Sequence, residues 1–224
     1  SGATESAVGE APVRGGGDPP TAVTAAERRR LLLRVARGEG HPDNAVPSVV
    51  GGLVATALEQ DTVRWVPLPL SPAVGIAYAA PPVEVRTDDA RERLPAQIAH
   101  SDAAANGARL AVLLSGLANA DGDRIAWGIV DHLHVPWRWA AVPRADDASA
   151  AALEAGAWGV TLSGSGSGLL AFSPRDRAAE VAGAMGDVFA GVPGHGPAWA
   201  FPLRRALVGA AVLSDPGRDV SGER

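Results

Sequence analysis

The stretch GEGHPDNAVPSVVGG, residues 38–52, brings an acid, an imidazole, a second acid and an amide together within six positions. It directly follows a segment that predicts a helix, because residues 24–27, Thr-Ala-Ala-Glu, form a capping box before ERRRLLLRVAR. Gly38 is the expected end of that helix, since glycine commonly follows the last helical turn. A plain turn needs a single Asn or Gly, so the number of polar side chains here asks for a second explanation.

Two interpretations of these polar residues remain open. On composition alone the simpler one is a turn in which Asp43 and Asn44 bond to their own backbone beside His41. Glu39 argues for the other, because a carboxylate is electrostatically unfavourable at the C-terminus of a helix. An acid placed there beside an imidazole hints at a bound cation or at the ammonium group of a substrate.

The composition narrows the classes of function. With 224 residues, of which 46% are hydrophobic, the chain can form one large domain or two small ones. A formal net charge of −5 argues against nucleic acid and acidic membranes as partners. The chain has no cysteine, which excludes disulfides, thiolate zinc sites and a cysteine nucleophile and fits a cytoplasmic protein. We expect no signal peptide and no membrane-spanning segment.

Helix and strand signals alternate irregularly along the rest of the chain. Strands or hairpins are predicted at residues 52–70 with a turn at Gln60-Asp61, at 73–80, at 159–173 and at 197–203, and helices at 101–118 with Ser101 as cap, at 123–134, at 147–157 and at 175–192, besides a short helix or turn after residue 44 and a cap at Thr87. This order favours an α+β fold over a doubly wound parallel sheet.

The run Ser163-Gly-Ser-Gly-Ser-Gly168 has two interpretations. The simpler one is a flexible linker. However, the run lies between the short apolar segments WGVTL and LLAF, which are too close together to be separate domains. A glycine loop inside a core element lets backbone amides approach an anion, so we favour a loop close to a phosphate group.

Two sets of polar residues share helical faces. Thr87 and Arg91 are four residues apart, and Asp102, Asn106 and Arg109 form the second set. Each set is more simply interpreted as a surface network than as a site.

The segment DHLHVPWR, residues 131–138, contains two imidazoles and an arginine. His132 and His134 are two residues apart, on opposite sides of a helix, and without a third ligand nearby they do not indicate zinc. Arg138 lies between Trp137 and Trp139, so it is either stacked on aromatic faces or available as a clamp for a carboxylate.

Taken together, four stretches resemble the homoserine kinases of the GHMP kinase superfamily. The matching motifs, in chain order, are Glu39-Gly-His-Pro-Asp-Asn44 with Pro47 and Gly51-Gly52, then Thr87-x-x-x-Arg91-x-x-Leu94-Pro95 with Asp102, Asn106 and Arg109, then Asp131-x-Leu133-His134-x-Pro136-x-Arg138, and finally Gly156-Ala-Trp-Gly159 with Leu162 to Gly166. The resemblance covers about residues 1 to 205, and the first motif is nearly private to these kinases.

The resemblance implies transfer of the γ-phosphoryl group of ATP to the side-chain hydroxyl of L-homoserine, a step toward threonine. The implied substrate-binding residues are His41, Asp43, Asn44, Thr87, Arg91 and Arg138, with Arg138 on the substrate carboxylate. The implied ATP-binding residues are Ser1, Gly2, Ala3, Ser163, Gly164, Ser165 and Gly166, and Glu39 is the nearest acid for Mg²⁺. No residue is assigned as catalytic base, and the resemblance leaves room for a homodimer.

The same resemblance predicts two domains. Residues 1–70 would be the remainder of an N-terminal domain of the ribosomal S5-like type, residues 71–214 a ferredoxin-like C-terminal domain, and residues 215–224 a tail. Because residues 1–3 match only the end of the family's ATP loop, the chain is expected to be N-terminally incomplete, either as a fragment or as a decayed homologue. The alternatives in function are another small-alcohol kinase of the superfamily and an inactive fragment that keeps an amino-acid pocket.

Overall fold

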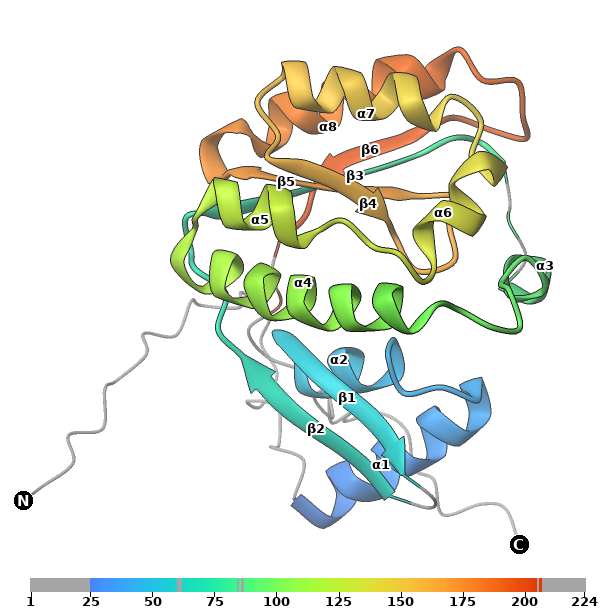
Figure 1. Ribbon diagram of the computed structural model, residues 1–224, viewed down its shortest axis with the longest axis vertical. Helices are drawn as coiled ribbons and strands as arrows, with labels where there is room; N and C mark the ends of the chain where they lie inside the picture. Colours follow the sequence, from blue (N-terminus) through green and yellow to red (C-terminus); the bar gives the residue numbers. More distant parts are fainter. Residues whose placement is uncertain (1–24, 60–61, 84, 86, 205, 207–224) are drawn as a thin grey trace, which may run out of the picture.

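The fold is seen in a computed structural model that describes residues 25–59, 62–83, 85, 87–204 and 206 (Figure 1). Its helices are α1 (Ala25–Glu39), α2 (Ala45–Val50), α3 (Thr87–Glu92), α4 (His100–Asn119), α5 (Gly122–Gly128), α6 (Val135–Arg138), α7 (Ala145–Glu154) and α8 (Ala178–Ala190). Its strands are β1 (Leu53–Glu59), β2 (Thr62–Leu68), β3 (Val74–Ala80), β4 (Gly159–Leu162), β5 (Leu169–Pro174) and β6 (Trp199–Pro202). The predicted site residues Ser1, Gly2 and Ala3, the cap residue Thr24, the turn Gln60-Asp61 and the tail 215–224 lie outside the described residues.

The larger part of the molecule is a four-stranded antiparallel sheet with the strand order β4-β5-β3-β6 (Figure 1). If β3, β4, β5 and β6 are numbered 1 to 4 in chain order, the order across the sheet is 4-1-3-2. This is the strand order of a ferredoxin-like domain. We call the region from Val74 to Pro202 the sheet unit. The prediction of an α+β fold is confirmed.

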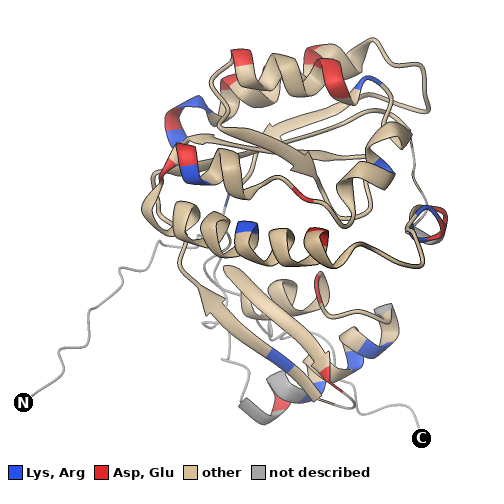
Figure 2. Cartoon of the chain, in the orientation of Figure 1, with Lys and Arg blue, Asp and Glu red and all other residues tan. Residues whose placement is uncertain are grey.

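Helices cover both faces of this sheet. Helices α7 and α8 lie on one face, where Met185 and Phe189 are fully buried against Leu169 (Figure 1). Helices α4 and α5 lie on the other face, where Leu117 and Ile125 form a second apolar cluster. The four strands of the sheet carry no charged residue, and Figure 2 shows the acids and arginines on the helices and loops around it. Because helices cover both faces, the residues of β3, β4 and β5 are buried or half-buried, which explains their apolar composition, whereas the four residues of the edge strand β6 are exposed.

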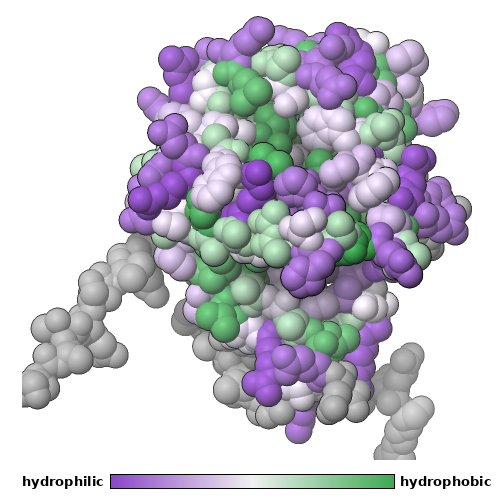
Figure 3. Space-filling model, viewed as in Figure 1, coloured by the Kyte–Doolittle hydropathy of each residue, from purple (hydrophilic) through white to green (hydrophobic). Residues whose placement is uncertain are grey.

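A smaller part, which we call the hairpin unit, contains α1, α2, β1 and β2. The hairpin pairs Leu53 with Leu68 at one end and Glu59 with Thr62 at the other. One face of the hairpin packs on the two helices through a cluster that contains Leu32, Val46 and Val49. The predicted hairpin at 52–70 and the short helix after residue 44 are therefore present. A space-filling view shows a mixture of hydrophilic and hydrophobic residues across both units (Figure 3).

Two predicted helix ends were wrong. Helix α1 passes Gly38 and ends at Glu39, because the left-handed conformation that stops it falls on Gly40, whose φ is +75°. Helix α4 begins at His100, one residue before the predicted cap Ser101. Its N-cap is Ala99, whose side chain cannot accept a hydrogen bond, so an extended backbone at that residue starts the helix without a polar cap.

The predicted helix at 123–134 is interrupted. Helix α5 ends at Gly128, and the chain then turns through Asp131 into the short α6. The Asp131 carboxylate accepts backbone N–H groups that a continuous helix would have paired with carbonyls, and this competition breaks the helix. Thr87, predicted as a cap, is the first residue of α3. No helix within the described ranges is both long and apolar enough to cross a membrane.

Candidate functional site

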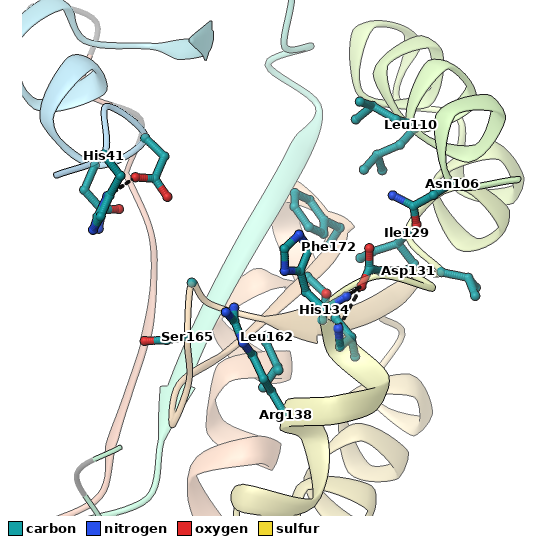
Figure 4. Close-up of a pocket in the computed structure, with 18 of the residues that line it drawn as sticks. His41, Asn106, Leu110, Ile129, Asp131, His134, Arg138, Leu162, Ser165 and Phe172 are labelled. Carbon is teal, nitrogen blue, oxygen red and sulfur yellow. Dashed lines mark hydrogen bonds and ion pairs between the residues drawn. The ribbon is translucent and has the colours of Figure 1, made fainter. Parts of the chain in front are cut away.

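A pocket of about 510 Å³ lies between the hairpin unit and the sheet unit (Figure 4). The hairpin unit contributes the turn after α1, and the sheet unit contributes α3, α4, the segment from α5 to α6, and the ends of β4 and β5. The polar lining residues are His41, Asp43, Asn44, Arg91, Asn106, Asp131, His134, Arg138, Thr161 and Ser165. The pocket therefore collects residues from positions separated by most of the described chain.

The turn after α1 carries the polar set noted in the sequence. His41 Nδ1 and Asp43 Oδ1 are hydrogen-bonded. The Asp43 carboxylate therefore bonds to the imidazole of His41 and not, as the turn interpretation has it, to the backbone of Asp43 itself. Asn44 is the residue before α2, but its side chain does not cap that helix. The backbone carbonyl oxygen of Asn44 accepts a hydrogen bond of 2.9 Å from the Ser48 hydroxyl. All three residues line the pocket. A plain turn would not require this.

Two arginines supply positive charge to the pocket. Arg138 belongs to α6, and its Nε donates to the carbonyl oxygen of Ala90 at 3.1 Å. Ala90 is fully buried in α3 and is followed by Arg91, which also lines the pocket. The chain contains no lysine, so every permanently charged cationic side chain is a planar guanidinium. Such a group can bind a carboxylate or a phosphate through two parallel hydrogen bonds.

Asp131 organises the segment that leads to Arg138. Its Oδ2 accepts the N–H groups of Leu133 at 3.2 Å, His134 at 2.6 Å and Val135 at 2.7 Å. Burial by itself would raise the pKa of the Asp131 carboxyl, but the three backbone hydrogen bonds and the nearby His134 together bring that pKa below its ordinary value. Asp131 is therefore a carboxylate at neutral pH.

Helix α4 is tied to the same segment. The Asn106 side-chain oxygen accepts the N–H of His132 at 2.9 Å. Arg109 donates to the carbonyl oxygen of Trp127 at 2.7 Å and lies 5.8 Å from the centroid of its ring. Asn106 lines the pocket, whereas Asp102 and Arg109 do not. Of the predicted set on this helical face, Arg109 thus serves packing between α4 and α5.

The glycine loop between β4 and β5 closes another side of the pocket. The Ser163 N–H donates to the Gly168 carbonyl at 2.8 Å, and the Gly166 N–H donates to the Ser163 carbonyl at 3.0 Å. Gly164 and Ser165 line the pocket, and within the described residues their N–H groups make no backbone hydrogen bond. Ser167 donates to the Val83 carbonyl at 2.5 Å, which fixes the far side of the loop. The run is thus a structured loop rather than a linker.

The structure brings together most of the residues proposed as substrate-binding. His41, Asp43, Asn44, Arg91 and Arg138 line the same pocket, as do Gly164 and Ser165 from the proposed ATP set. The side chains of Glu39 and Thr87 lie outside the part that the structure describes. The roles of all these residues stay predictions.

Other pocket residues were not named as site residues from the sequence. They are the polar Asn106, Asp131, His134 and Thr161, the apolar Leu110, Leu113, Ile129, Val130, Val135, Leu162 and Phe172, and Gly128. Asp131 and His134 stand in the third motif, so their spacing before Arg138 was the available signal. The apolar residues gave none, because a residue that lines a pocket and one that fills a core have the same sequence pattern.

The described side chains do not form a cluster of metal ligands. Among them, no group of three or more His, Cys, Asp or Glu residues could hold a metal ion. Glu39, the residue suggested for Mg²⁺, is not among the described side chains, so its role toward the ion stays a prediction.

Comparisons with known proteins point to one family. Residues 140–191 match the family model for the GHMP kinase C-terminal domain. The homoserine kinase of Parasynechococcus marenigrum is 39% identical over 188 residues, which cover 78% of this chain and 59% of that protein. The homoserine kinase of Gloeobacter violaceus is 41% identical over 154 residues, which cover 69% of this chain and 51% of that protein.

A solved structure agrees. The crystal structure of homoserine kinase from Cytophaga hutchinsonii matches with a TM-score of 0.70 and 32% identity, over 79% of this chain and 56% of that one. This chain spans between about half and three fifths of the length of these relatives. Residues 140–191 are thus a match to the GHMP kinase C-terminal domain, and the chain is similar in sequence and fold to homoserine kinases.

Proposed function

We propose that the chain phosphorylates the side-chain hydroxyl of L-homoserine with ATP, giving O-phospho-L-homoserine in threonine biosynthesis. The observation that carries this proposal is the lining of one pocket by the turn His41–Asn44, by Arg91 and Arg138, and by the glycine loop. The relatives named homoserine kinase support the choice of substrate.

The chemistry of the pocket suits an amino acid with a short polar side chain. Arg138, with its Nε held by Ala90, would present its remaining N–H groups to the substrate carboxylate. The paired His41 and Asp43 and the amide of Asn44 would meet the amino and hydroxyl groups. Leu110, Leu113 and Phe172 supply an apolar wall that would exclude water from the reacting centre.

The nucleotide would approach from the glycine loop. The N–H groups of Gly164 and Ser165 would donate hydrogen bonds to an anion, since both residues line the pocket and no backbone carbonyl within the described residues accepts from these N–H groups. Phosphoryl transfer needs alignment of the reacting groups and neutralisation of charge more than covalent chemistry from the protein. Arg91 is exposed and lines the pocket, and it would add positive charge near the bound homoserine. Mg²⁺ belongs to the proposal as an expectation from the family only, and we assign no step to it.

The proposal extends to location and partners. We place the protein in the cytoplasm, with L-homoserine and ATP as its small-molecule partners and without nucleic acid or membrane as partners. The negative net charge supports the exclusion of polyanions. A homodimer remains part of the proposal.

A binding and turnover experiment tests the proposal. Purified protein is titrated calorimetrically with L-homoserine, with L-serine and with mevalonate, and phosphate transfer is then measured for each alcohol with Mg-ATP. We expect binding and turnover with L-homoserine, and little of either with the two comparison alcohols. Transfer to another alcohol would favour a different small-molecule kinase. Binding of homoserine without turnover would favour an inactive amino-acid pocket, and no binding of homoserine would overturn the proposal.

A further inference from the structure

The segment Asp131–Arg138 reaches the pocket at both of its ends. Asp131 and His134 line the pocket at the first end, and Arg138 lines it at the second (Figure 4). The second half of the segment is α6, a helix of four residues that ends at Arg138. A helix of one turn has almost no internal hydrogen bonds, so groups outside it must fix its position.

Asp131 accepts the backbone N–H groups that lead into α6, the last of which belongs to Val135, the first residue of the helix. One oxygen of its carboxylate accepts three consecutive N–H groups, those of residues 133–135. His134, the residue in the N-cap position of α6, makes no side-chain cap bond of its own. The carboxylate three positions earlier in the chain therefore sets where the helix begins and in which direction it runs.

The other end of the segment is held through the arginine itself. The Nε of Arg138 donates to the carbonyl oxygen of Ala90, which is buried in α3. A further hydrogen bond links the side-chain oxygen of Asn106 on α4 to the N–H of His132. In Figure 4 the Arg138 side chain extends from α6 toward the pocket, near Leu162 and Ser165 in this view. The direction of α6 thus decides whether the guanidinium reaches both Ala90 and the pocket.

We propose that Asp131 is a positioning residue for Arg138. By accepting the three N–H groups at the start of α6, its carboxylate aligns the helix so that Arg138 bonds to Ala90 and presents its terminal N–H groups to an anion in the pocket. The inference rests on the proposed function only for the identity of that anion, the carboxylate of L-homoserine.

Three variants separate geometry from charge. Asp131→Asn keeps a side-chain oxygen at the same distance but removes the charge, whereas Asp131→Glu keeps the charge but moves the oxygen. Asp131→Ala removes both. Positioning requires that Asn retains most of the function and that Glu and Ala lose it. Direct binding of a substrate ammonium group by the carboxylate requires the opposite order for Asn and Glu.

The first measurement does not depend on any substrate. The Arg138 Nε–H signal is identified by NMR from its absence in Arg138→Lys, and its hydrogen exchange is followed in each variant. In Asp131→Ala and Asp131→Glu we expect exchange at least about tenfold faster, since losing a cap of this kind changes local stability by about a factor of ten. In Asp131→Asn the signal should stay protected. Unchanged protection in Asp131→Glu would overturn the proposal, even if Asp131→Ala does not fold.

The second measurement uses L-homoserine and a double-mutant cycle. Asp131→Ala should weaken homoserine binding about tenfold in the wild-type background and have no effect in the Arg138→Ala background, because the arginine that it positions is then absent. Asp121→Ala is the matched control, since Asp121 caps α5 at 3.1 Å and does not line the pocket. It should lower the melting temperature and leave homoserine binding unchanged. An equal loss in both Arg138 backgrounds would overturn the proposal.

The two measurements distinguish the failures. If the wild-type protein does not bind L-homoserine, the proposed function fails, while the exchange of the Arg138 Nε–H still decides whether Asp131 positions Arg138. If homoserine binds but exchange is insensitive to Asp131, the proposed function stands and the positioning role is wrong.

Discussion

The Nε of Arg138 and the carbonyl oxygen of Ala90 form a hydrogen bond of 3.1 Å between residues 48 positions apart. This bond connects α6 directly to α3, whose last turn carries Arg91. Because both helices are short, neither would hold its arginine firmly alone. The bond therefore joins the two short helices that carry Arg91 and Arg138.

Arg138→Ala is the most direct test of the site. The variant should weaken L-homoserine binding by about 2 kcal/mol or more, because the substrate carboxylate would lose a hydrogen-bonded charged partner. Arg138→Lys should recover only part of the loss, since an ammonium group lacks the planar fork. Calorimetry on each variant gives the affinity.

A thermal melt of Arg138→Ala distinguishes binding of the substrate carboxylate from a packing role of Arg138 between Trp137 and Trp139. If the arginine serves packing alone, the melting temperature falls while homoserine affinity stays at the wild-type value. That result would make Arg138 a structural residue.

Asn44→Ala tests the turn after α1. The Asn44 amide lines the pocket without capping α2, so its removal should weaken homoserine binding by about 1 kcal/mol, the usual net contribution of one hydrogen bond. Ser48→Ala is the control, because Ser48 lies on α2, does not line the pocket and donates its hydroxyl to the Asn44 backbone carbonyl. Equal affinities in the two variants would show that Asn44 does not contact the ligand.

The stability of the protein should depend on pH through Asp131. Its pKa is lowered in the folded state, so the carboxylate stabilises the fold above the ordinary aspartate pKa of about 4, and this contribution disappears as the pH falls through the lower, folded value. The difference in melting temperature between wild type and Asp131→Asn should therefore shrink between pH 7 and pH 3. Asp187→Asn, at an exposed position of α8, serves as the control for other titrating groups. A difference that stays constant over this range would contradict the prediction.

Gly128→Ala should destabilise the protein although alanine favours helices. A Cβ at Gly128 would lie 2.4 Å from the backbone nitrogen of Leu113, so α4 and α5 would have to separate. We expect a loss of about 2 kcal/mol in the free energy of unfolding, as for other overpacked sites. Gly107→Ala is the matched control on α4, because nothing lies within 4 Å of the added Cβ. It should be neutral or stabilise by up to about 1 kcal/mol, and chemical denaturation of both variants measures the difference.

Much of the fold could be predicted from the sequence because the strong signals are local. The alternating hairpin at 52–70, the apolar strand at 73–80 and the long helix after Ser101 all depend on periodic patterns that the packing preserves. The strand order could not be predicted in this way, since it depends on contacts between distant segments. It followed instead from the resemblance to a known family.

The ends of elements were harder to predict for a physical reason. Gly38 and Gly40 are equally suited to end α1, and only the packing of the chain after them selects Gly40. The break at Asp131 depends on a side chain competing with carbonyl groups, which a hydrophobic pattern does not reveal. For the site, motif spacing identified the charged residues of the pocket but not its apolar wall.

The return of the chain toward the hairpin unit has a mechanical consequence. Leu203 still donates its N–H to Ile76 of the sheet, while the Ala206 carbonyl accepts the N–H of Gly52 at the base of the hairpin. The first crossing between the units, after β2, is anchored by Ser71, whose N–H donates to the Leu117 carbonyl. Two bodies joined by a single strand can swivel in any direction, but a second tether leaves free only the rotation about the line through both. We therefore expect any relative movement of the two units to be mainly a rotation about the line through these two connections, and such a rotation would change the distance between His41 on one unit and Arg138 on the other.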